Sequence, residues 1–364
     1  MVAAQAAAGM IIIRRYLAGA ILGTTALVLG VLLVLGGFVE FIGQLDDVGT
    51  GGFGIVQALA FALMQLPDLA FTVLPMAVLL GSLLGLGSLA GGSEIIALRA
   101  AGASPVALAR AVLATGAGLA LLTLVIGLYI APPLERYARQ YRTFAMQGPS
   151  GLASAESAWV RDGDVIMNLS QLGDPTRFGG VYLFRLAPPG RLASVARADS
   201  ATFGAGKEWT LNNFAESRFE DSGVAVRRER RFAEVTGLNP DLLSLTVVRA
   251  EALDGFALWR YIRYLRSNEL DSRHFEVELW SRIAASVAVV PMCVLALAFC
   301  FGALRRAGTG ARMVIGVVTG LGYFLASRGL ADGGELYRFD PLLVGWLPTL
   351  LLATVTAVAL ARAR

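Results

Sequence analysis

VALARAVLATGAGLALLTLVIGLYI, residues 106–130, is the stretch that decides the fold. A helix needs about 20 consecutive apolar residues to cross the hydrocarbon core of a bilayer, and this stretch is long enough. Five other stretches meet the same criterion, so we predict an α-helical polytopic membrane protein with six transmembrane helices. The other five are residues 17–41, 69–89, 283–304, 313–330 and 342–360.

The polar segment after the third span, residues 131–254, has the pattern of β structure. Short runs of β-branched and aromatic residues alternate with turn sequences such as Pro188-Pro189-Gly190. This pattern is typical of an antiparallel sandwich or an open jelly roll. We therefore expect an inserted all-β, jelly-roll-like domain. The strand runs are residues 159–169, 180–186, 195–203, 208–219 and 224–235.

The predicted organisation has three parts. Residues 1–130 hold the first three transmembrane helices and a short cytoplasmic helix at about residues 93–103. Residues 131–254 form the β domain, and residues 255–364 hold an interfacial helix and the last three transmembrane helices.

Two further segments are expected at the membrane surface. Residues 255–270 carry apolar residues at helical spacing and arginines on another face, as in helices that lie in the interface. Residues 54–66 precede Pro67 and are too short to span alone, so we expect an interfacial or broken lead-in to the second span. In residues 255–270 the apolar residues are Phe256, Trp259, Ile262 and Leu265, and the arginines are Arg260, Arg263 and Arg266.

The orientation follows from the positive-inside rule, which concerns arginines and lysines beside short loops. With the N-terminus inside, arginines gather in the cytoplasmic loops and acidic residues in the short outer loops. We therefore expect both termini in the cytoplasm and the β domain outside. The inner arginines are Arg14, Arg15, Arg99, Arg110, Arg305, Arg306, Arg312, Arg362 and Arg364.

Several function classes are disfavoured. The net charge of +4 for 364 residues gives no indication of nucleic-acid binding, and His274 is the only histidine, so we expect neither a histidine metal site nor a catalytic triad. Cys293 and Cys300 are too far apart along one helix for a disulfide or a metal pair, and we expect both to be buried apolar residues.

The source of energy for any transport must lie in another subunit. The middle of the six spans lacks the ionisable side chains that ion-coupled carriers generally use. Gly206-Lys207-Glu208 lacks the spacing of a phosphate-binding loop. We therefore predict a protein that is not an enzyme and holds no cofactor of its own.

A short cytoplasmic helix, residues 93–101, is expected between the second and third spans. Ser93 can cap it, Glu94 is favourable in its first turn, and Gly102 and Pro105 end it. Such a helix presents Glu94 and Arg99 outward and Ile95 and Leu98 for burial. An ordinary solvated turn is the alternative.

Residues 81–105, GSLLGLGSLAGGSEIIALRAAGASP, together with Ala131-Pro132-Pro133 and ELWSR at residues 278–282, resemble a known family. The chain is similar over essentially its whole length to the lipopolysaccharide export system permeases (LptF/LptG, YjgP/YjgQ-type), and to the LptG-type subunit in particular. The Ser93–Gly102 block is the specific part of this resemblance.

The resemblance implies a permease subunit of an ABC transporter that extracts lipopolysaccharide from the inner membrane of Gram-negative bacteria for transport to the outer membrane. It implies a periplasmic jelly roll between the third and fourth spans. It also implies four protein partners: a homologous LptF-type permease, an LptB-type ATPase dimer that holds ATP-Mg, an LptC-type single-span protein and a periplasmic bridge protein.

The resemblance also assigns roles to individual residues. Glu94 falls where the coupling helix of the family meets the ATPase, and Ile95, Leu98 and Arg99 belong to the same helix. Arg139 and Arg142 fall on family positions that face the phosphorylated head of the lipid.

The chemistry of the residues agrees with this assignment. Arg136, Arg139 and Arg142 recur at three-residue intervals and share one broad face if the helix continues past Pro133. A planar guanidinium suits phosphate bidentately, so we expect these arginines to bind the lipid head. A solvated flank of the β domain is the alternative.

One departure from the family concerns the end of the first span. Enterobacterial members carry lysines there that approach the lipid phosphates, whereas this chain has Glu40, Asp46 and Asp47. Either the lipid is charged differently at this point, for example with bridging divalent cations, or recognition of the head group has shifted to arginines.

Helix packing gives a last expectation. Gly19xxxGly23, Gly81xxxGly85 and Gly316xxxGly320 each permit a close approach between helices. We expect the first and fifth spans to line an opening toward the partner permease, where Tyr323 and Phe324 could meet acyl chains. The alternative function is a mechanotransmission or signalling subunit whose β domain binds a partner without moving lipid.

Overall fold

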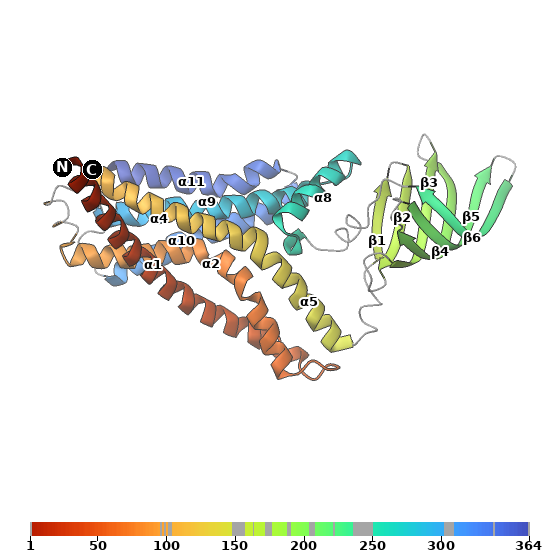
Figure 1. The fold of residues 1–364 in the computed structure, drawn as a ribbon, viewed down its shortest axis with the longest axis horizontal. Helices are drawn as coiled ribbons and strands as arrows, with labels where there is room; N and C mark the ends of the chain where they lie inside the picture. Colours follow the sequence, from red (N-terminus) through yellow and green to blue (C-terminus); the bar gives the residue numbers. More distant parts are fainter. Residues whose placement is uncertain are drawn as a thin grey trace. The chain divides into compact units, whose positions relative to one another are not determined.

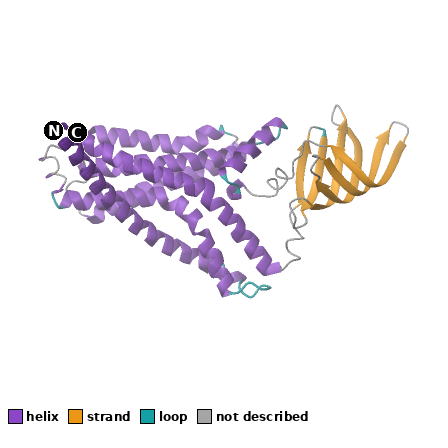
Figure 2. Cartoon of the chain, viewed as in Figure 1, coloured by secondary structure: helices purple, strands orange, loops and turns teal. Residues whose placement is uncertain are grey.

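The computed structural model describes residues 2–94, 97, 100, 104–147, 157–162, 164–171, 177–187, 191–203, 208–220, 223–235, 250–301, 309–337 and 339–362. Long helices form one part of the chain and a single β-sheet forms another (Figures 1 and 2). The chain divides into two compact units. One holds Met1–Asp46, Ala62–Glu135 and Arg273–Arg364, and the other holds Asp47–Phe61 and Arg136–Ser272.

The described residues include six helices that are long and apolar enough to cross a membrane, as predicted. The third span begins as the sequence indicates: Ser104 precedes Pro105, and the Ala107 N–H donates to Ser104 Oγ at 3.2 Å. The helices that make up these spans are α1 (Val2–Gly43), α2 (Ile55–Gly91), α4 (Pro105–Val125), α9 (Arg273–Phe301), α10 (Thr309–Tyr337) and α11 (Pro341–Arg362).

The expectation of a broken lead-in to the second span is wrong. Residues 54–66 are not separate, because α2 begins at Ile55 and runs without interruption through Pro67 and Pro75. A proline removes one backbone donor from a helix, and neighbouring groups in a membrane bundle can compensate for it. A proline in the sequence therefore does not have to end a membrane-spanning helix.

The third span continues well beyond residue 130. After α4, a π turn, η2 (Ile126–Ile130), leads directly into α5 (Ala131–Gln147), and the Ala131 N–H donates to Ile126 O. The wide turn stands next to Pro132 and Pro133, which have no N–H to donate. The helix therefore continues past Pro133, which places the three predicted arginines on one helix.

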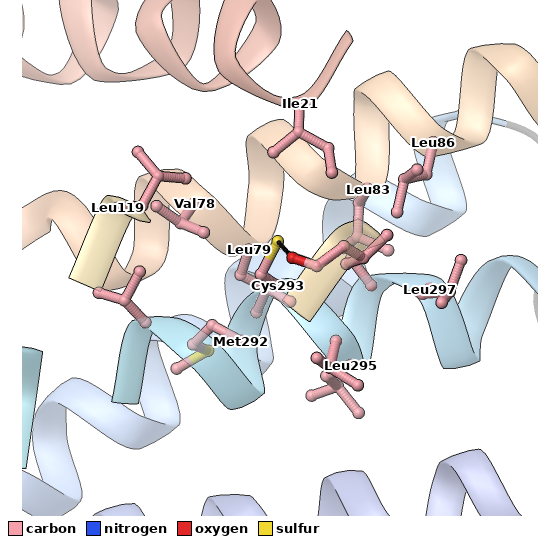
Figure 3. Packing of buried hydrophobic residues seen from close by; sticks show 14 of the residues in the cluster. Ile21, Val78, Leu79, Leu83, Leu86, Leu119, Met292, Cys293, Leu295 and Leu297 are labelled. Carbon is pink, nitrogen blue, oxygen red and sulfur yellow. Dashed lines mark hydrogen bonds between the residues drawn. The ribbon is translucent and has the colours of Figure 1, made fainter. Parts of the chain in front are cut away.

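The main core of the helical unit is built by α1, α2, α4 and α9 (Figure 3). Ile21, Leu79 and Leu83 pack with Met292 and Cys293, all nearly or fully buried. Cys293 and Cys300 are both buried and free, as predicted. The Ser82 hydroxyl donates to Cys293 Sγ at 3.4 Å, which satisfies a buried hydroxyl between α2 and α9.

Two of the glycine pairs are filled by helices of this same chain. A Cβ at Gly316 would lie 2.7 Å from Leu80, and a Cβ at Gly81 would overlap the backbone of Thr25. The Gly316xxxGly320 face therefore seats α10 on α2, and the expectation that it faces a partner permease is wrong. In the part of the chain that the structure describes, Gly19 and Gly23 have nothing within 4 Å of such a Cβ.

The sheet is a six-stranded, fully antiparallel sheet in which sequence neighbours pair in the order β1-β2-β3-β4-β5-β6. The predicted run at residues 159–169 is two strands, because Asp162 pairs with Val165 across a tight turn. The sheet is open, in keeping with the predicted jelly-roll-like domain. The strands are β1 (Ser157–Asp162), β2 (Val165–Gln171), β3 (Arg177–Ala187), β4 (Arg191–Phe203), β5 (Glu208–Glu220) and β6 (Gly223–Val235).

One face of the sheet is apolar, and among its described side chains the buried charge is that of Glu216. Side chains alternate across a strand, and the buried set includes Val181 and Leu183 of β3 and Trp209 and Leu211 of β5. Glu216 is 2% exposed and accepts hydrogen bonds from Ser194 Oγ at 2.7 Å and from Arg185 at 2.5 Å. Burial raises the pKa of Glu216, but these hydrogen bonds and the charges of Arg185 and Arg218 outweigh it and hold the pKa below its usual value.

A short turn, η3 (Ala250–Ala252), leads to the amphipathic helix α8 (Gly255–Ser267). Asp254 Oδ1 accepts the Ala257 N–H at 2.8 Å and caps the helix. The predicted apolar set divides: Ile262 and Leu265 are buried, whereas the rings of Phe256 and Trp259 are exposed and lie under Arg260 and Arg263. The domain boundaries and the interfacial position of this helix stay predictions.

Candidate functional site

Two carboxylate contacts involve candidate residues, one in each compact unit. Glu94 is bound by Tyr16 of α1 in the unit that holds most of the long helices. Asp47, in η1 (Leu45–Asp47), pairs with Arg142 of α5 in the other unit. The two contacts differ in their chemistry.

In the helical unit, Glu94 is bound by a side chain that the sequence did not suggest. The Tyr16 hydroxyl of α1 donates to Glu94 Oε2 at 2.5 Å, and both side chains are exposed. Glu94 follows α2, so this hydrogen bond links α1 to the segment between the second and third spans. The carboxylate thus keeps access to solvent while it is held in position by α1.

The segment that begins at Ser93 starts as a helical turn. The Ala97 N–H donates to Ser93 O at 3.0 Å. Ser93 itself has φ +60°, in the left-handed region, rather than the extended conformation usual for an N-cap. Of the other residues predicted for this helix, Ile95, Leu98 and Arg99 lie outside the described residues.

A buried arginine supports the same end of the helical unit. Arg312 of α10 is 7% exposed, and its Nη1 donates to Gly87 O of α2 at 2.9 Å. The sequence suggested only that Arg312 belongs to the inner loops. The last turns of α2 therefore contact α10, while Glu94, which follows α2, contacts α1 through Tyr16.

In the second unit, the three predicted arginines lie on α5 and have different surroundings. The Arg136 guanidinium donates to Ala252 O at 3.1 Å, which ties α5 to the turn before α8. Arg142 forms an ion pair with Asp47. Arg139 is exposed, and its carbonyl accepts a hydrogen bond from Thr143 Oγ1 at 3.0 Å.

The Asp47–Arg142 ion pair gives the reversed charge after α1 a structural role. The two side chains are 34% and 38% exposed, and the Arg142 guanidinium also lies over the Phe61 ring, 5.7 Å from its centroid. Glu40, the first of the three acidic positions, accepts a hydrogen bond from Gln44 at 3.0 Å. Asp46 is exposed.

A second buried arginine comes from the ELWSR block. Arg282 of α9 is 6% exposed, its Nε lies 2.7 Å from Glu278 Oε1, and its Nη1 donates to Gly127 O at 3.3 Å. Gly127 lies in the π turn of the third span. Arg282 therefore joins α9 to the π turn of the third span. This contact could not be predicted from the sequence, because the two residues meet only in the folded chain.

The two aromatic residues predicted to meet acyl chains, Tyr323 and Phe324, differ in their contacts and their exposure. The Tyr323 hydroxyl lies 3.2 Å from Thr349 Oγ1 of α11, and its ring packs partly against the main core. Phe324 is 37% exposed. The surfaces of α1 and α10 also carry highly exposed apolar residues, including Val34 and Val318.

These features define a polytopic membrane protein of six transmembrane helices with an inserted antiparallel β-sheet domain. One polar contact ties α1 to the segment after α2, and another ties η1 to α5 within the second unit.

The chain belongs to the lipopolysaccharide export system permease LptF/LptG family, whose model matches residues 15–362. This confirms the resemblance found in the sequence.

Individual relatives are similar over nearly the whole chain. The chain is 31% identical over 340 residues to the lipopolysaccharide export system permease protein LptG of Escherichia coli K12, covering 93% of this chain and 94% of that protein. It is 30% identical over 351 residues to LptG of Haemophilus influenzae, covering 96% and 98%. It is 24% identical over 355 residues to LptF of Escherichia coli K12, covering 95% and 94%.

Proposed function

We propose that this chain is the LptG-type permease subunit of an ABC transporter that extracts lipopolysaccharide from the inner membrane for transport to the outer membrane. The observation that carries the proposal is the family match over residues 15–362, with higher identity to the proteins named LptG than to those named LptF. These names favour export over a mechanotransmission or signalling role without lipid movement.

The partners follow from the same proposal. An LptF-type permease completes a heterodimer, an LptB-type ATPase dimer hydrolyses ATP-Mg, and an LptC-type protein and a periplasmic bridge protein carry the lipid onward. The exposed apolar residues of α1 and α10 support contact with a second permease or with acyl chains, because such surfaces are stable only against lipid or another apolar helix.

Glu94 is the proposed contact with the ATPase. It is exposed, it starts the segment between the second and third spans, and the Tyr16 hydroxyl holds it. A charged pair that becomes desolvated at an interface can be worth a few kcal/mol when one partner is removed. Such a contact would transmit movement of the ATPase to α1 as well as to α2.

The arginines of α5 are the proposed contact with the anionic lipid head. Arg139 is exposed on the face that it shares with Arg142. In the proposed orientation both termini are cytoplasmic and the sheet is periplasmic, which puts this part of α5 at the outer-leaflet head groups. Guanidinium groups recognise phosphate with paired hydrogen bonds.

The test is purification and reconstitution. The chain is expressed with candidate LptF-type and LptB-type subunits, and copurified proteins and lipids are identified by mass spectrometry. ATP-dependent release of lipopolysaccharide from proteoliposomes is then measured. The proposal predicts a stable complex with ATPase and lipid; an ATPase-bound complex that neither binds nor releases lipopolysaccharide would refute export.

A further inference from the structure

The loop after α1 is firmly attached to the end of α5. The Gly52 N–H donates to Ala145 O at 2.7 Å, and a Cβ at Gly51, which has φ +61°, would overlap Met146 O. Phe53 is 1% exposed and its N–H donates to Thr50 O at 3.1 Å. The backbone of this loop is therefore held by contacts of its own, independent of the Asp47 side chain.

Arg142 is likewise positioned by more than its ion pair. Its guanidinium lies over the ring of Phe61, which is 4% exposed, and the helical backbone of α5 fixes where the side chain starts. A cation over an aromatic face is attracted to it without any carboxylate. Removing the Asp47 charge should therefore leave Arg142 close to its present position.

We propose that the Asp47 carboxylate occupies the place on Arg142 that an anionic phosphate of the lipid head would take, so that Asp47 competes with the lipid for this arginine. This inference rests on the proposed function and concerns what the lipid must displace. Asp47 is then a specificity-determining residue for the head group, and the chain does not present Arg142 as an open anion site.

The competition has a chemical consequence. A paired guanidinium attracts a distant anion less than an unpaired one, because the carboxylate cancels its charge. A phosphomonoester carries a charge of about −1.5 to −2 and three acceptor oxygens, against about −1 for a carboxylate. A head group with a phosphomonoester can therefore replace Asp47 on Arg142, whereas a head group without phosphate cannot.

The experiment uses the full-length chain, with the subunits that copurify with it, in phosphatidylcholine nanodiscs. A photoreactive residue replaces Tyr137, which is 57% exposed on α5, and the probe is bis-phosphorylated or dephosphorylated lipid A. Asp47→Asn should raise crosslinking of the bis-phosphorylated probe about three- to fivefold, the effect expected for losing one partly exposed ion pair, and should leave the dephosphorylated probe unchanged.

Two variants control for charge and for the loop. Asp46→Asn makes the same change of net charge at the neighbouring exposed position, and Asp47→Glu keeps a competing carboxylate, so both should crosslink like the parent chain. The inference is overturned if Asp47→Asn leaves crosslinking unchanged or lowers it, or if Asp46→Asn raises it equally.

Crosslinking of the parent chain distinguishes a failure of this inference from a failure of the proposed function. If it shows no crosslink to lipid A and Arg139→Glu/Arg142→Glu makes no difference, the lipid-binding part of the proposed function fails. If the parent chain crosslinks, the double variant does not, and Asp47→Asn matches the parent, the proposed function stands and only the competition by Asp47 is refuted.

Discussion

The two compact units each hold one carboxylate contact, and the contacts are of different kinds. In the helical unit, the neutral hydroxyl of Tyr16 donates one hydrogen bond to Glu94, a carboxylate on a short segment. In the other unit, the carboxylate of Asp47 forms an ion pair with Arg142, a cation that an aromatic ring also holds. A contact of the first kind leaves the charge of the carboxylate unneutralised, whereas one of the second kind removes it.

The difference between the two contacts indicates which kind of binding each one permits. Glu94 keeps its negative charge for a cationic partner while α1 holds it in position, which suits a docking contact. Arg142 has its charge compensated, which suits a contact that must be exchanged before a new anion binds. Within the helical unit, the Thr24 hydroxyl donates to Gly81 O at 2.6 Å, which holds α1 against α2.

The largest expected effect comes from reversing the charge of Glu94, the proposed contact with the ATPase. Glu94→Lys should abolish ATP-driven release of lipopolysaccharide, because it would place a cation opposite an arginine of the ATPase in the proposed interface. Insertion in the membrane should persist, since Glu94 is exposed. Release is measured from proteoliposomes and insertion by membrane fractionation. Normal release by this variant would remove Glu94 from the interface.

The next largest effect is expected from reversing the charges of Arg139 and Arg142 on α5. Arg139→Glu/Arg142→Glu should lower photo-crosslinking of lipopolysaccharide about tenfold or more, because two cations that we propose to bind phosphate become anions. Complex assembly and basal ATP hydrolysis should stay measurable. The control is Arg228→Glu/Arg230→Glu on exposed β6, which makes the same change of charge elsewhere. Undiminished crosslinking in the α5 variant would assign Arg139 and Arg142 to the solvated surface.

A smaller effect should follow from disturbing the close contact between α1 and α2 at Gly81. Gly81→Ala places a methyl group against the backbone of Thr25, and overpacking of this kind costs about 1–3 kcal/mol. We expect a lower thermal unfolding temperature and several-fold weaker lipid release. Gly118→Ala is the matched control, because in the described part of the chain nothing lies within 4 Å of its added Cβ. Equal behaviour of the two variants would argue against close packing of α1 on α2.

The smallest effect is expected from the neutral hydrogen bond. Tyr16→Phe removes only the hydroxyl that reaches Glu94, and a hydrogen bond between two exposed side chains contributes little because water competes for both groups. Lipid released per ATP hydrolysed should fall about two- to threefold, while ATPase binding persists. Tyr129→Phe, at a 59% exposed tyrosine, should change nothing. An unchanged ratio for Tyr16→Phe would show that this link carries no coupling.

The sequence by itself determined the features that depend on neighbours along the chain. The length of an apolar stretch fixes whether a helix can span a bilayer, so all six spans were predictable. The Ser104-Pro105 start of the third span and most strands of the sheet depend on local turn and capping chemistry in the same way. The block from Ser93 to Gly102 also carried the family resemblance before any fold was known.

The tertiary structure alone decided which side chains meet. Tyr16 and Glu94 are 78 residues apart in the sequence, and Asp47 and Arg142 are 95 apart. Each contact joins segments that are far apart in the chain and meet only through packing within one unit, which no local pattern encodes. Hydropathy likewise could not tell that Gly316 packs on α2 or that α2 continues through Pro67, because a glycine face fits any helix and a broken hydrogen bond is tolerated wherever packing compensates for it.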